Sequence, residues 1–295
     1  MSGVRTVGVA GTGRMGSAAT LRLASQGFDV TVANRTAAAA ADLAGRADCS
    51  YAESFAELAS TSDVVLVLTS GEDGTRETVL GPKGLLAEPR PGSTILIMST
   101  VTPQVIRELA EAAADAGVAL TDVPISGRPL ELSQGAVTLL AGGSKELLTR
   151  VTPVLDALGH TVIVGPTGAA AAMKLGVNAV VFGLVTAIAE CLTLATASGV
   201  DPEIAYDVLR ASAVASTFID VRRAAFVSDP PPPVQFSMLS TQETLELIVR
   251  AANESGVTLP QTLANLAIAR EAASTGLADD DVTRLAQFLS GRSRR

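Results

Sequence analysis

Two kinds of segment alternate along the first 165 residues of the chain. Short β-branched, apolar runs are separated by Ala-rich stretches, which is the pattern of a parallel sheet covered by helices. After residue 165 the β-rich runs stop, and Ala, Leu and Ile recur at helical spacings. The sequence therefore predicts an α/β domain over residues 1–165 and an all-α domain over residues 166–295, joined by a long helix at about 167–198. The strands expected in the first domain are Thr6–Ala10, Asp29–Ala33, Val64–Leu68, Thr94–Met98, Ala119–Val123, Ala136–Ala141 and Thr161–Val164.

The composition excludes several classes of protein. With 47% hydrophobic and 18% charged residues the chain is globular, and its net charge of −8 disfavours nucleic acid and anionic membranes as partners. One histidine, His160, and two cysteines, Cys49 and Cys191, are too few for a histidine-rich or four-cysteine metal site or a disulfide framework. We expect His160 to lie in a turn before the last strand and the cysteines to be ordinary thiols. No metal is expected.

The chain also carries few signals for export or for membrane insertion. The N-terminal residues lack a basic region followed by an apolar stretch and a cleavage site, so a cytoplasmic protein is expected. The apolar run over residues 169–197 is interrupted by Lys174, Asn178 and Glu190, which favours a long buried helix over a membrane span. The basic run at the C-terminus, GRSRR at residues 291–295, is interpreted as a solvated helix end.

The first predicted strand leads directly into three glycines at a fixed spacing. Gly11, Gly13 and Gly16 form a G-x-G-x-x-G pattern that opens a helix. The first glycine permits the tight turn, the second lets the backbone approach a pyrophosphate, and the third lets the helix pack against the strand. The alternative is a glycine-rich turn without a ligand. The residues predicted to bind a dinucleotide here are Gly11, Thr12, Gly13, Arg14, Met15 and Gly16.

The end of the second strand indicates which dinucleotide is bound. An NAD site usually has an acid there to accept from the ribose 2′-hydroxyl, whereas a 2′-phosphate favours Arg. This strand ends in Asn34, Arg35 and Thr36, and its one acid, Asp29, is at the opposite end. We therefore predict that the chain prefers NADPH to NADH. A solvated Arg35 in a turn is the alternative.

A lysine on the long predicted helix is a candidate acid or base. Lys174 and Asn178 are four residues apart, hence on one face. A lysine among apolar residues tends to have a lowered pKa, as proton transfer near neutrality requires, although it can also extend to the surface. A second candidate is the segment from Asp122 to Gly127, where the Ser126 hydroxyl and the Gly127 amide could hold an anion such as a carboxylate or form an ordinary turn.

These motifs, in this order, resemble those of the β-hydroxyacid dehydrogenases, a group within the superfamily of 6-phosphogluconate dehydrogenases and imine reductases. GVAGTGRMG with NRT resembles the cofactor motif of the NADP-dependent members, DVPISG the substrate loop, and GPTGAAAAMKLGVN the catalytic helix. The resemblance implies a Rossmann-like domain followed by a helical domain, and a homodimer or tetramer assembled through the helical part. It also implies that the cofactor contacts Thr69, Ser70 and Thr100, the last within MSTVTP.

The implied reaction is hydride transfer between the nicotinamide and a small 3-hydroxy acid or semialdehyde. Lys174 would be the general acid/base, Asn178 would orient it, and Ser126 and Gly127 would hold the substrate carboxylate. Plain 3-hydroxyisobutyrate is not the expected substrate, because the chain departs from the family pattern at its substrate positions.

Two departures bear on the substrate. Where typical members have further glycines after the substrate loop, this chain has Arg128-Pro-Leu-Glu131, and where they have Lys-Asp it has Glu243 and Thr244. An inward Arg128 could pair with an extra anionic group and an inward Glu243 with an amine or iminium. Both could instead be surface charges. An imine-reductase-like enzyme and a catalytically silent NADP(H)-binding protein are the competing functions.

Overall fold

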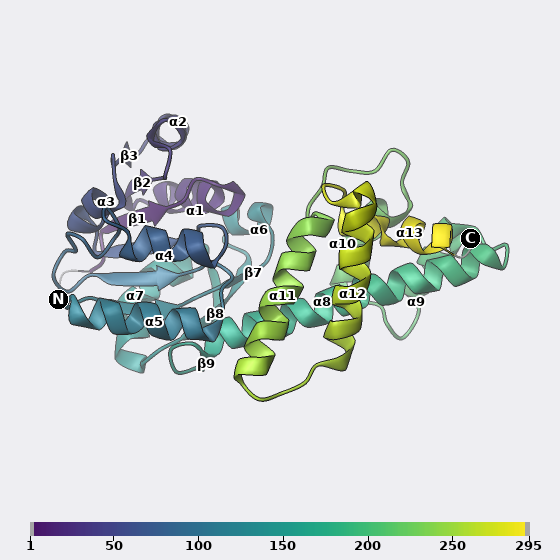
Figure 1. Ribbon diagram of the computed structural model, residues 1–295. Coiled ribbons are helices and arrows are strands. Elements are labelled where there is room, and N and C mark those ends of the chain that lie inside the picture. Colours follow the sequence, from purple (N-terminus) through teal and green to yellow (C-terminus); the bar gives the residue numbers. More distant parts are fainter. Residues whose placement is uncertain (1–2, 293–295) are drawn as a thin grey trace. The chain divides into compact units, whose positions relative to one another are not determined.

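The computed structural model describes residues 3–292, which form two compact units that divide between Leu175 and Gly176. A 29-residue helix, α8 (Ala169–Ala197), continues from the first unit into the second (Figure 1). The predicted architecture of an α/β part, a long linking helix and a helical part is confirmed. The helix begins two residues later than predicted, because Gly168 has φ +92°, outside the helical region. Of the basic C-terminal run, residues 293–295 lie outside the described part.

A six-stranded parallel sheet forms the centre of the first unit. Its spatial order is β3-β2-β1-β4-β5-β6, so the order reverses between β1 and β4. In open sheets of this kind ligands bind beyond the carboxyl ends of the strands at that reversal. The strands are β1 (Thr6–Ala10), β2 (Asp29–Ala33), β3 (Ser50–Tyr51), β4 (Val64–Val67), β5 (Thr94–Ile97) and β6 (Ala119–Asp122).

Helices cover both faces of this sheet. Alternate side chains of β4 point to opposite faces, so Val64 and Leu66 belong to one core cluster and Val65 and Val67 to the other. Both faces are therefore apolar, as a buried parallel sheet requires. The first cluster includes side chains of α1 (Arg14–Ser25), α2 (Ala37–Ala47) and α7 (Lys145–Leu158), and the second those of α3 (Phe55–Thr61), α4 (Glu72–Leu80) and α5 (Pro103–Asp115).

The last two predicted strands do not join the main sheet. They form a separate three-stranded sheet of β7 (Ile125–Ser126), β8 (Val137–Gly142) and β9 (Gly159–Gly165), in which β7 and β8 are antiparallel. The chain reverses after β7 through α6 (Pro129–Ser133), so β8 pairs with β7 and does not extend the main sheet beyond β6. The prediction for His160 was wrong, because it is an exposed residue within β9, opposite Thr138.

The second unit is helical among its described residues. Helix α9 begins at Pro202, and the carboxylate of its N-cap, Asp201, accepts from the Glu203 amide at 2.8 Å. The core of this unit includes Ile188 of α8 and Tyr206 of α9. The helices after α8 are α9 (Pro202–Ala211), α10 (Thr217–Val227), α11 (Met238–Glu254), α12 (Pro260–Ala272) and α13 (Leu285–Arg292), with short turns at Ala273–Leu277 and Val282–Arg284.

Helix α8 is less buried than the sequence suggested. By length and composition it could cross a membrane, with a mean hydropathy of 1.9, and 33% of its most apolar window is buried. Its first turn nevertheless belongs to the α/β unit, where Ala171 is 3% exposed and packs in the second core cluster. Val180 and Leu194, further along the helix, are exposed.

Candidate active site

The glycine-rich turn connects β1 to α1 at the carboxyl edge of the main sheet. Gly11 has φ +108°, and its amide donates to the Ala33 carbonyl at 2.8 Å. A Cβ on Gly16 would lie 1.9 Å from the Gly11 carbonyl oxygen, so only glycine lets α1 approach the turn this closely. A Cβ on Gly13 would meet nothing within 4 Å. The backbone at Gly13 is therefore open to a ligand, as a pyrophosphate site requires.

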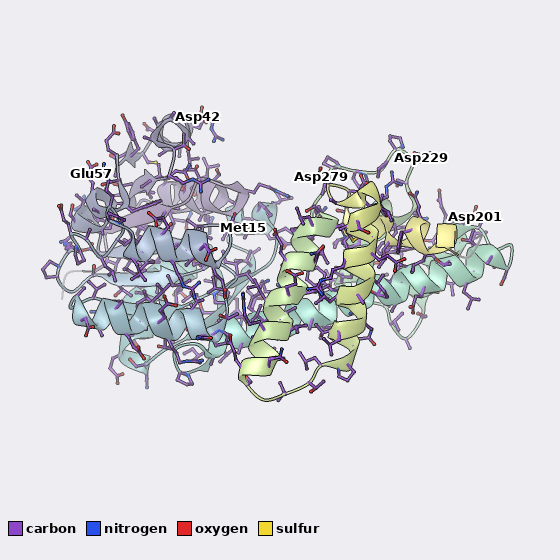
Figure 2. All side chains as sticks on the ribbon, viewed as in Figure 1. Met15, Asp42, Glu57, Asp201, Asp229 and Asp279 are labelled. Atoms are coloured by element: carbon purple, nitrogen blue, oxygen red, sulfur yellow. The ribbon has the colours of Figure 1, made fainter. Side chains whose placement is uncertain are left out.

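The other residues of this turn form the start of helix α1. Gly13 is its N-cap, and no acid lies in the first turn, so nothing there opposes an anion electrostatically. Met15 is half-buried against the first core cluster, and Figure 2 marks its position. The hydroxyl of Ser17 donates to the Thr12 carbonyl at 3.0 Å and thereby fixes the turn.

The end of β2 presents one cation and no acid. Arg35 is exposed, and the Asn34 side-chain amide donates to the Thr36 carbonyl at 3.4 Å, which shapes the turn into α2. Helix α2 likewise has no acid in its first turn. Asp29, at the other end of the strand, pairs with Arg5 at 2.9 Å. The local charge at the carboxyl end of β2 is therefore positive and suits a phosphate.

Three hydroxyl groups meet where β4 and β5 end. The Thr69 amide donates to Ser99 Oγ at 3.0 Å, and the Thr69 hydroxyl lies 3.2 Å from that of Thr75. Ser70 is exposed and Thr100 is half-buried at the same edge. Thr69, Ser70 and Thr100 thus lie at neighbouring strand ends beside the glycine turn. The contact of Ser99 with Thr69 was missed, because it depends on pairing between segments 30 residues apart, and that of Thr75, six residues from Thr69, because it depends on how α4 follows β4.

The predicted substrate loop is anchored on the second sheet. Ser126 is half-buried in β7, opposite Thr138 of β8. Gly127 has φ +152°, and a Cβ there would lie 2.6 Å from a methyl group of Val137, so packing alone already requires glycine at this position. The backbone of Ser126 is therefore held by a short ladder, and α6 begins shortly after it.

Arg128 is not a free cation. Its guanidinium pairs with Glu131, with Nε 2.9 Å from Oε1, and its amide donates to Oε2 at 2.8 Å. The contact with Arg128 holds the pKa of the Glu131 carboxyl below its usual range. Any contact between Arg128 and an anionic substrate group must therefore compete with a neighbour three residues away.

Lys174 stands in the second turn of α8. It is half-buried, and burial lowers the pKa of its amine from 10.5 to about 8. An acid beside a lysine would raise its pKa, but burial is the cause of the shift here. Asn178 follows one turn later on the same face of the helix and is also half-buried. The pair therefore combines a perturbed amine with a neutral amide, as a proton-transfer site needs.

Asp122, at the end of β6, joins the start of α8 to the sheet. It is fully buried, and its two carboxylate oxygens accept from the amides of Gly168 and Ala171, each at 2.7 Å. Asp122 belongs to the predicted substrate motif, which assigns it no role. In the sequence it lies four residues before Ser126. Its contact with Gly168, 46 residues away, depends on the tertiary structure and could not be predicted from the motif.

Glu243, the last predicted substrate residue, lies on α11 in the second unit. Its side chain is exposed, and Thr244 beside it is half-buried, with its hydroxyl bonded to the Ser240 carbonyl at 2.8 Å. These two residues stand where typical family members have a lysine and an aspartate. Their role toward a substrate stays a prediction.

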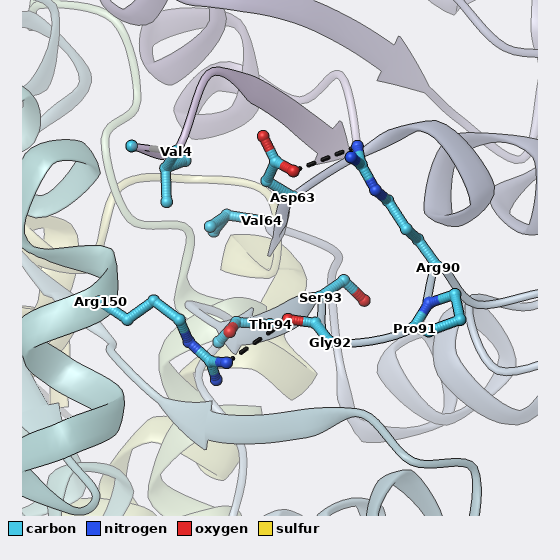
Figure 3. Close-up of a pocket in the computed structure, with 10 residues that line it drawn as sticks. Val4, Asp63, Val64, Arg90, Pro91, Gly92, Ser93, Thr94 and Arg150 are labelled. Atoms are coloured by element: carbon cyan, nitrogen blue, oxygen red, sulfur yellow. Dashed lines mark hydrogen bonds and ion pairs between the residues drawn. The ribbon is translucent and has the colours of Figure 1, made fainter. Parts of the chain in front are cut away.

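A cavity at the amino-terminal edge of the main sheet is separate from these residues. It has a volume of about 190 Å³ and is lined by residues that include Asp63, Arg90 and Arg150 (Figure 3). Arg90 pairs with Asp63 at 3.1 Å, and Arg150 donates to the Gly92 carbonyl at 3.4 Å. The carboxylate of Asp63 is thus paired within the protein, and the predicted ligand-binding residues lie at the opposite ends of the strands.

Comparison with known proteins identifies the family. The family model for the NAD-binding domain of 6-phosphogluconate dehydrogenase matches residues 6–165. A second family model, described as the NAD-binding part of NADP-dependent 3-hydroxyisobutyrate dehydrogenase, matches residues 168–289. The crystal structure of 3-hydroxyisobutyrate dehydrogenase from Salmonella typhimurium is 26% identical, has a TM-score of 0.86, and is matched over 96% of this chain and 99% of that one.

Two relatives differ in how much of their length this chain spans. The chain is 30% identical over 280 residues to cytokine-like nuclear factor N-PAC of Gallus gallus, over 95% of this chain but 50% of N-PAC. It is 28% identical over 284 residues to 2-(hydroxymethyl)glutarate dehydrogenase of Eubacterium barkeri, over 94% of this chain and 92% of that protein.

Imine reductases are also among the similar structures. Two of them, at 22% and 23% identity with TM-scores of 0.62 and 0.64, are matched over 96–97% of this chain and 99% of theirs, which shows a shared fold alone. Both halves of the chain match models of NAD(P)-dependent dehydrogenases. The chain therefore belongs to the β-hydroxyacid dehydrogenase family.

Proposed function

We propose that the chain is an NADPH-dependent oxidoreductase that interconverts a small carboxylate-bearing 3-hydroxy acid and its semialdehyde. The observation that carries the proposal is Lys174, an amine whose pKa burial lowers to about 8, on the helix that follows the α/β unit. At this pKa both the protonated and the neutral forms exist near neutrality. The lysine can therefore donate a proton in reduction and accept one in oxidation.

The residues at the carboxyl edge of the sheet fit a dinucleotide. The open backbone at Gly13 and the start of α1 suit a pyrophosphate, and the exposed Arg35 suits the 2′-phosphate that distinguishes NADPH. When bound, the coenzyme supplies or accepts the hydride. Thr69, Ser70 and Thr100, at the neighbouring strand ends, are proposed to contact it.

The substrate would be held by groups outside the coenzyme residues. Ser126 and the Gly127 amide are proposed to bind its carboxylate, and Asn178 to orient the Lys174 amine. Arg128 and Glu243 are proposed to bear on which substrate is accepted, and the pairing of Arg128 with Glu131 favours a substrate without an extra anionic group. The name 2-(hydroxymethyl)glutarate dehydrogenase of one relative fits the hydroxymethyl group next to a carboxylate, although glutarate carries a second carboxylate that the substrate proposed here lacks.

One assay of NADPH oxidation tests this proposal against two other functions. The exposed acid Glu243 in place of a lysine would suit a cationic imine, and the similarity to N-PAC, whose name is not that of an enzyme, would suit a silent coenzyme-binding protein. Oxidation of NADPH should be followed by absorbance with semialdehydes, 2-oxo acids and cyclic imines in turn. We expect turnover with semialdehydes. Turnover with cyclic imines alone, or with none of the three, would overturn the proposal.

Lys174→Met tests the role of the lysine directly, with Lys83→Met, at an exposed lysine, as the matched control. Removing a general acid/base should lower kcat by about 10²–10⁴-fold. NADPH binding, measured by fluorescence titration, should be unchanged in both variants. Near-normal turnover of Lys174→Met would exclude Lys174 as the proton donor.

A further inference from the structure

Within the first unit, one buried acid, Asp122, lies between the helix turn that carries Lys174 and the segment that carries Ser126. The Asp122 carboxylate is fully buried, and its oxygens accept two charge-assisted hydrogen bonds, from the Gly168 and Ala171 amides. Ala171 lies one helical turn before Lys174. Charge-assisted bonds of this kind are roughly twice as strong as neutral ones. The acid therefore fixes the turn of α8 from which the lysine projects.

The space around this carboxylate is filled by backbone. A Cβ on Gly142, in β8, would lie 2.5 Å from Asp122 Oδ1, so β8 approaches the acid as closely as its atoms allow. The Thr121 hydroxyl donates to the Gly142 carbonyl at 2.7 Å and lies 3.2 Å from the Thr167 hydroxyl. Strand β6, strand β8 and the start of α8 thus meet at one point, and the carboxylate cannot move without moving one of them.

The same short segment also places the proposed carboxylate anchor. Ser126 comes four residues after Asp122, and the segment between them is held by the Val123 amide on the Ile97 carbonyl at 2.8 Å and the Leu140 amide on the Pro124 carbonyl at 3.1 Å. Both of its ends are therefore fixed, one on α8 and the other on β8.

We propose that Asp122 is a positioning residue that holds the start of α8 against β6 and so sets where Lys174 stands relative to Ser126. This inference rests on the proposed function, because it assigns Asp122 to the same reaction. Asp122 does not touch the reacting atoms. It acts through the helix backbone, and a misplacement of about 1 Å at a reacting group can cost about 10²-fold in rate.

Asp122→Asn is the informative substitution. An amide has a single acceptor oxygen, so one of the two backbone amides would face an NH₂ group in place of an oxygen. Asp63→Asn is the control at the other edge of the sheet, since the Asp63 carboxylate also accepts from two backbone amides, those of Arg5 and Thr6, but both on Oδ2, at 3.0 Å, so the substitution leaves their acceptor in place.

Two readouts separate positioning from general stability. The first is the split between kcat and KM, measured with a semialdehyde that the wild-type chain reduces. The second needs no substrate: the chain has lysines only at 83, 145 and 174, so ¹³C-lysine labelling gives three side-chain Cε signals whose pH titrations are followed by NMR. Lys174→Met assigns the third signal.

We expect Asp122→Asn to lower kcat by about tenfold to a hundredfold with NADPH binding unchanged, and to move the titration midpoint of Lys174. The shift follows because burial sets the pKa of this amine, so a change in where the helix holds Lys174 changes its titration. Gly142→Ala, which crowds the carboxylate without changing it, should lower kcat as well and covers the case in which Asp122→Asn does not fold. Asp63→Asn should change neither readout.

The role of Asp122 is overturned if Asp122→Asn keeps the wild-type kcat and Lys174 titration, or if Asp63→Asn changes both equally. These outcomes are distinct from failure of the proposed function, in which the wild-type chain turns over no semialdehyde. In that case a shifted Lys174 titration in Asp122→Asn, absent from Asp63→Asn, still supports positioning, and an unshifted one refutes it.

Discussion

Two glycines of the same turn should respond to alanine in opposite ways. A Cβ on Gly16 would lie 1.9 Å from the Gly11 carbonyl oxygen, so α1 must move by more than an ångström to admit it. Overpacking of this kind costs about 1–3 kcal/mol. Gly13 has φ −66° and ψ −175°, which alanine adopts freely, and a Cβ there meets nothing within 4 Å. Gly13→Ala should therefore change the free energy of unfolding by less than about 1 kcal/mol.

The two variants should also differ in how they bind NADPH. A methyl group at Gly13 would occupy the space through which a pyrophosphate reaches the backbone, and losing one charge-assisted hydrogen bond costs about 1.5–3 kcal/mol, or roughly ten- to a hundredfold in Kd. Kd would be measured by fluorescence titration and the melting temperature by circular dichroism without coenzyme. For Gly16→Ala we expect a fall of roughly 2–4 °C for each kcal/mol lost.

Either of two results would contradict this reasoning. If Gly13→Ala binds NADPH with the wild-type Kd, the coenzyme does not approach the backbone at this turn. If Gly16→Ala has the melting temperature of the wild-type protein, α1 does not approach the Gly11 carbonyl closely enough to exclude a Cβ at residue 16. Addition of NADPH should raise the melting temperature of the wild type more than that of Gly13→Ala.

Three further predictions concern the coenzyme, the lysine and the assembly. Arg35→Ala should lower kcat/KM for NADPH by about ten- to a hundredfold and leave that for NADH unchanged; an unchanged ratio of the two would remove Arg35 from the 2′-phosphate site. Because the pKa of Lys174 is about 8 in the folded chain and 10.5 in an unfolded one, reduction should slow and oxidation should accelerate as the pH rises through about 8. The free energy of unfolding should rise from about pH 8 to 10.5, since there only the unfolded state still binds the proton; Lys174→Met should lack both effects. Val180 and Leu194 are 64% and 72% exposed on one face of α8, so we expect the chain to form a dimer by light scattering and Leu194→Glu to weaken it. A chain that is monomeric at all concentrations, or a dimer that Leu194→Glu leaves unchanged, would show that this face is not the interface.

Local sequence was sufficient where one segment determines the feature. The bounds of β1 and β2 agree with the prediction to the residue, because alternating β-branched runs end in turn residues. The positive φ of Gly11 and the Asp201-Pro202 start of α9 follow from chemistry within a few residues. The perturbed pKa of Lys174 also agrees with its apolar neighbours in sequence.

Pairing between distant segments was not predictable in the same way. The two-residue strands β3 and β7 are too short to carry a period, so the second sheet and the place of His160 within it were missed. The partner of Arg128 was missed for a different reason: Glu131 is three residues away, but only the turn of α6 brings the two side chains together.

The sequence by itself determined the order of the two halves, the long helix between them and the residue types available for chemistry, because hydrophobic period and glycine spacing act locally. Only the tertiary structure decided which of these residues are held in place. Ser99 reaches Thr69 because β4 and β5 are neighbours, and Asp122 contacts the start of α8 because β6 ends where that helix begins. A buried carboxylate needs hydrogen-bond donors, and the fold supplies them from backbone 46 and 49 residues away.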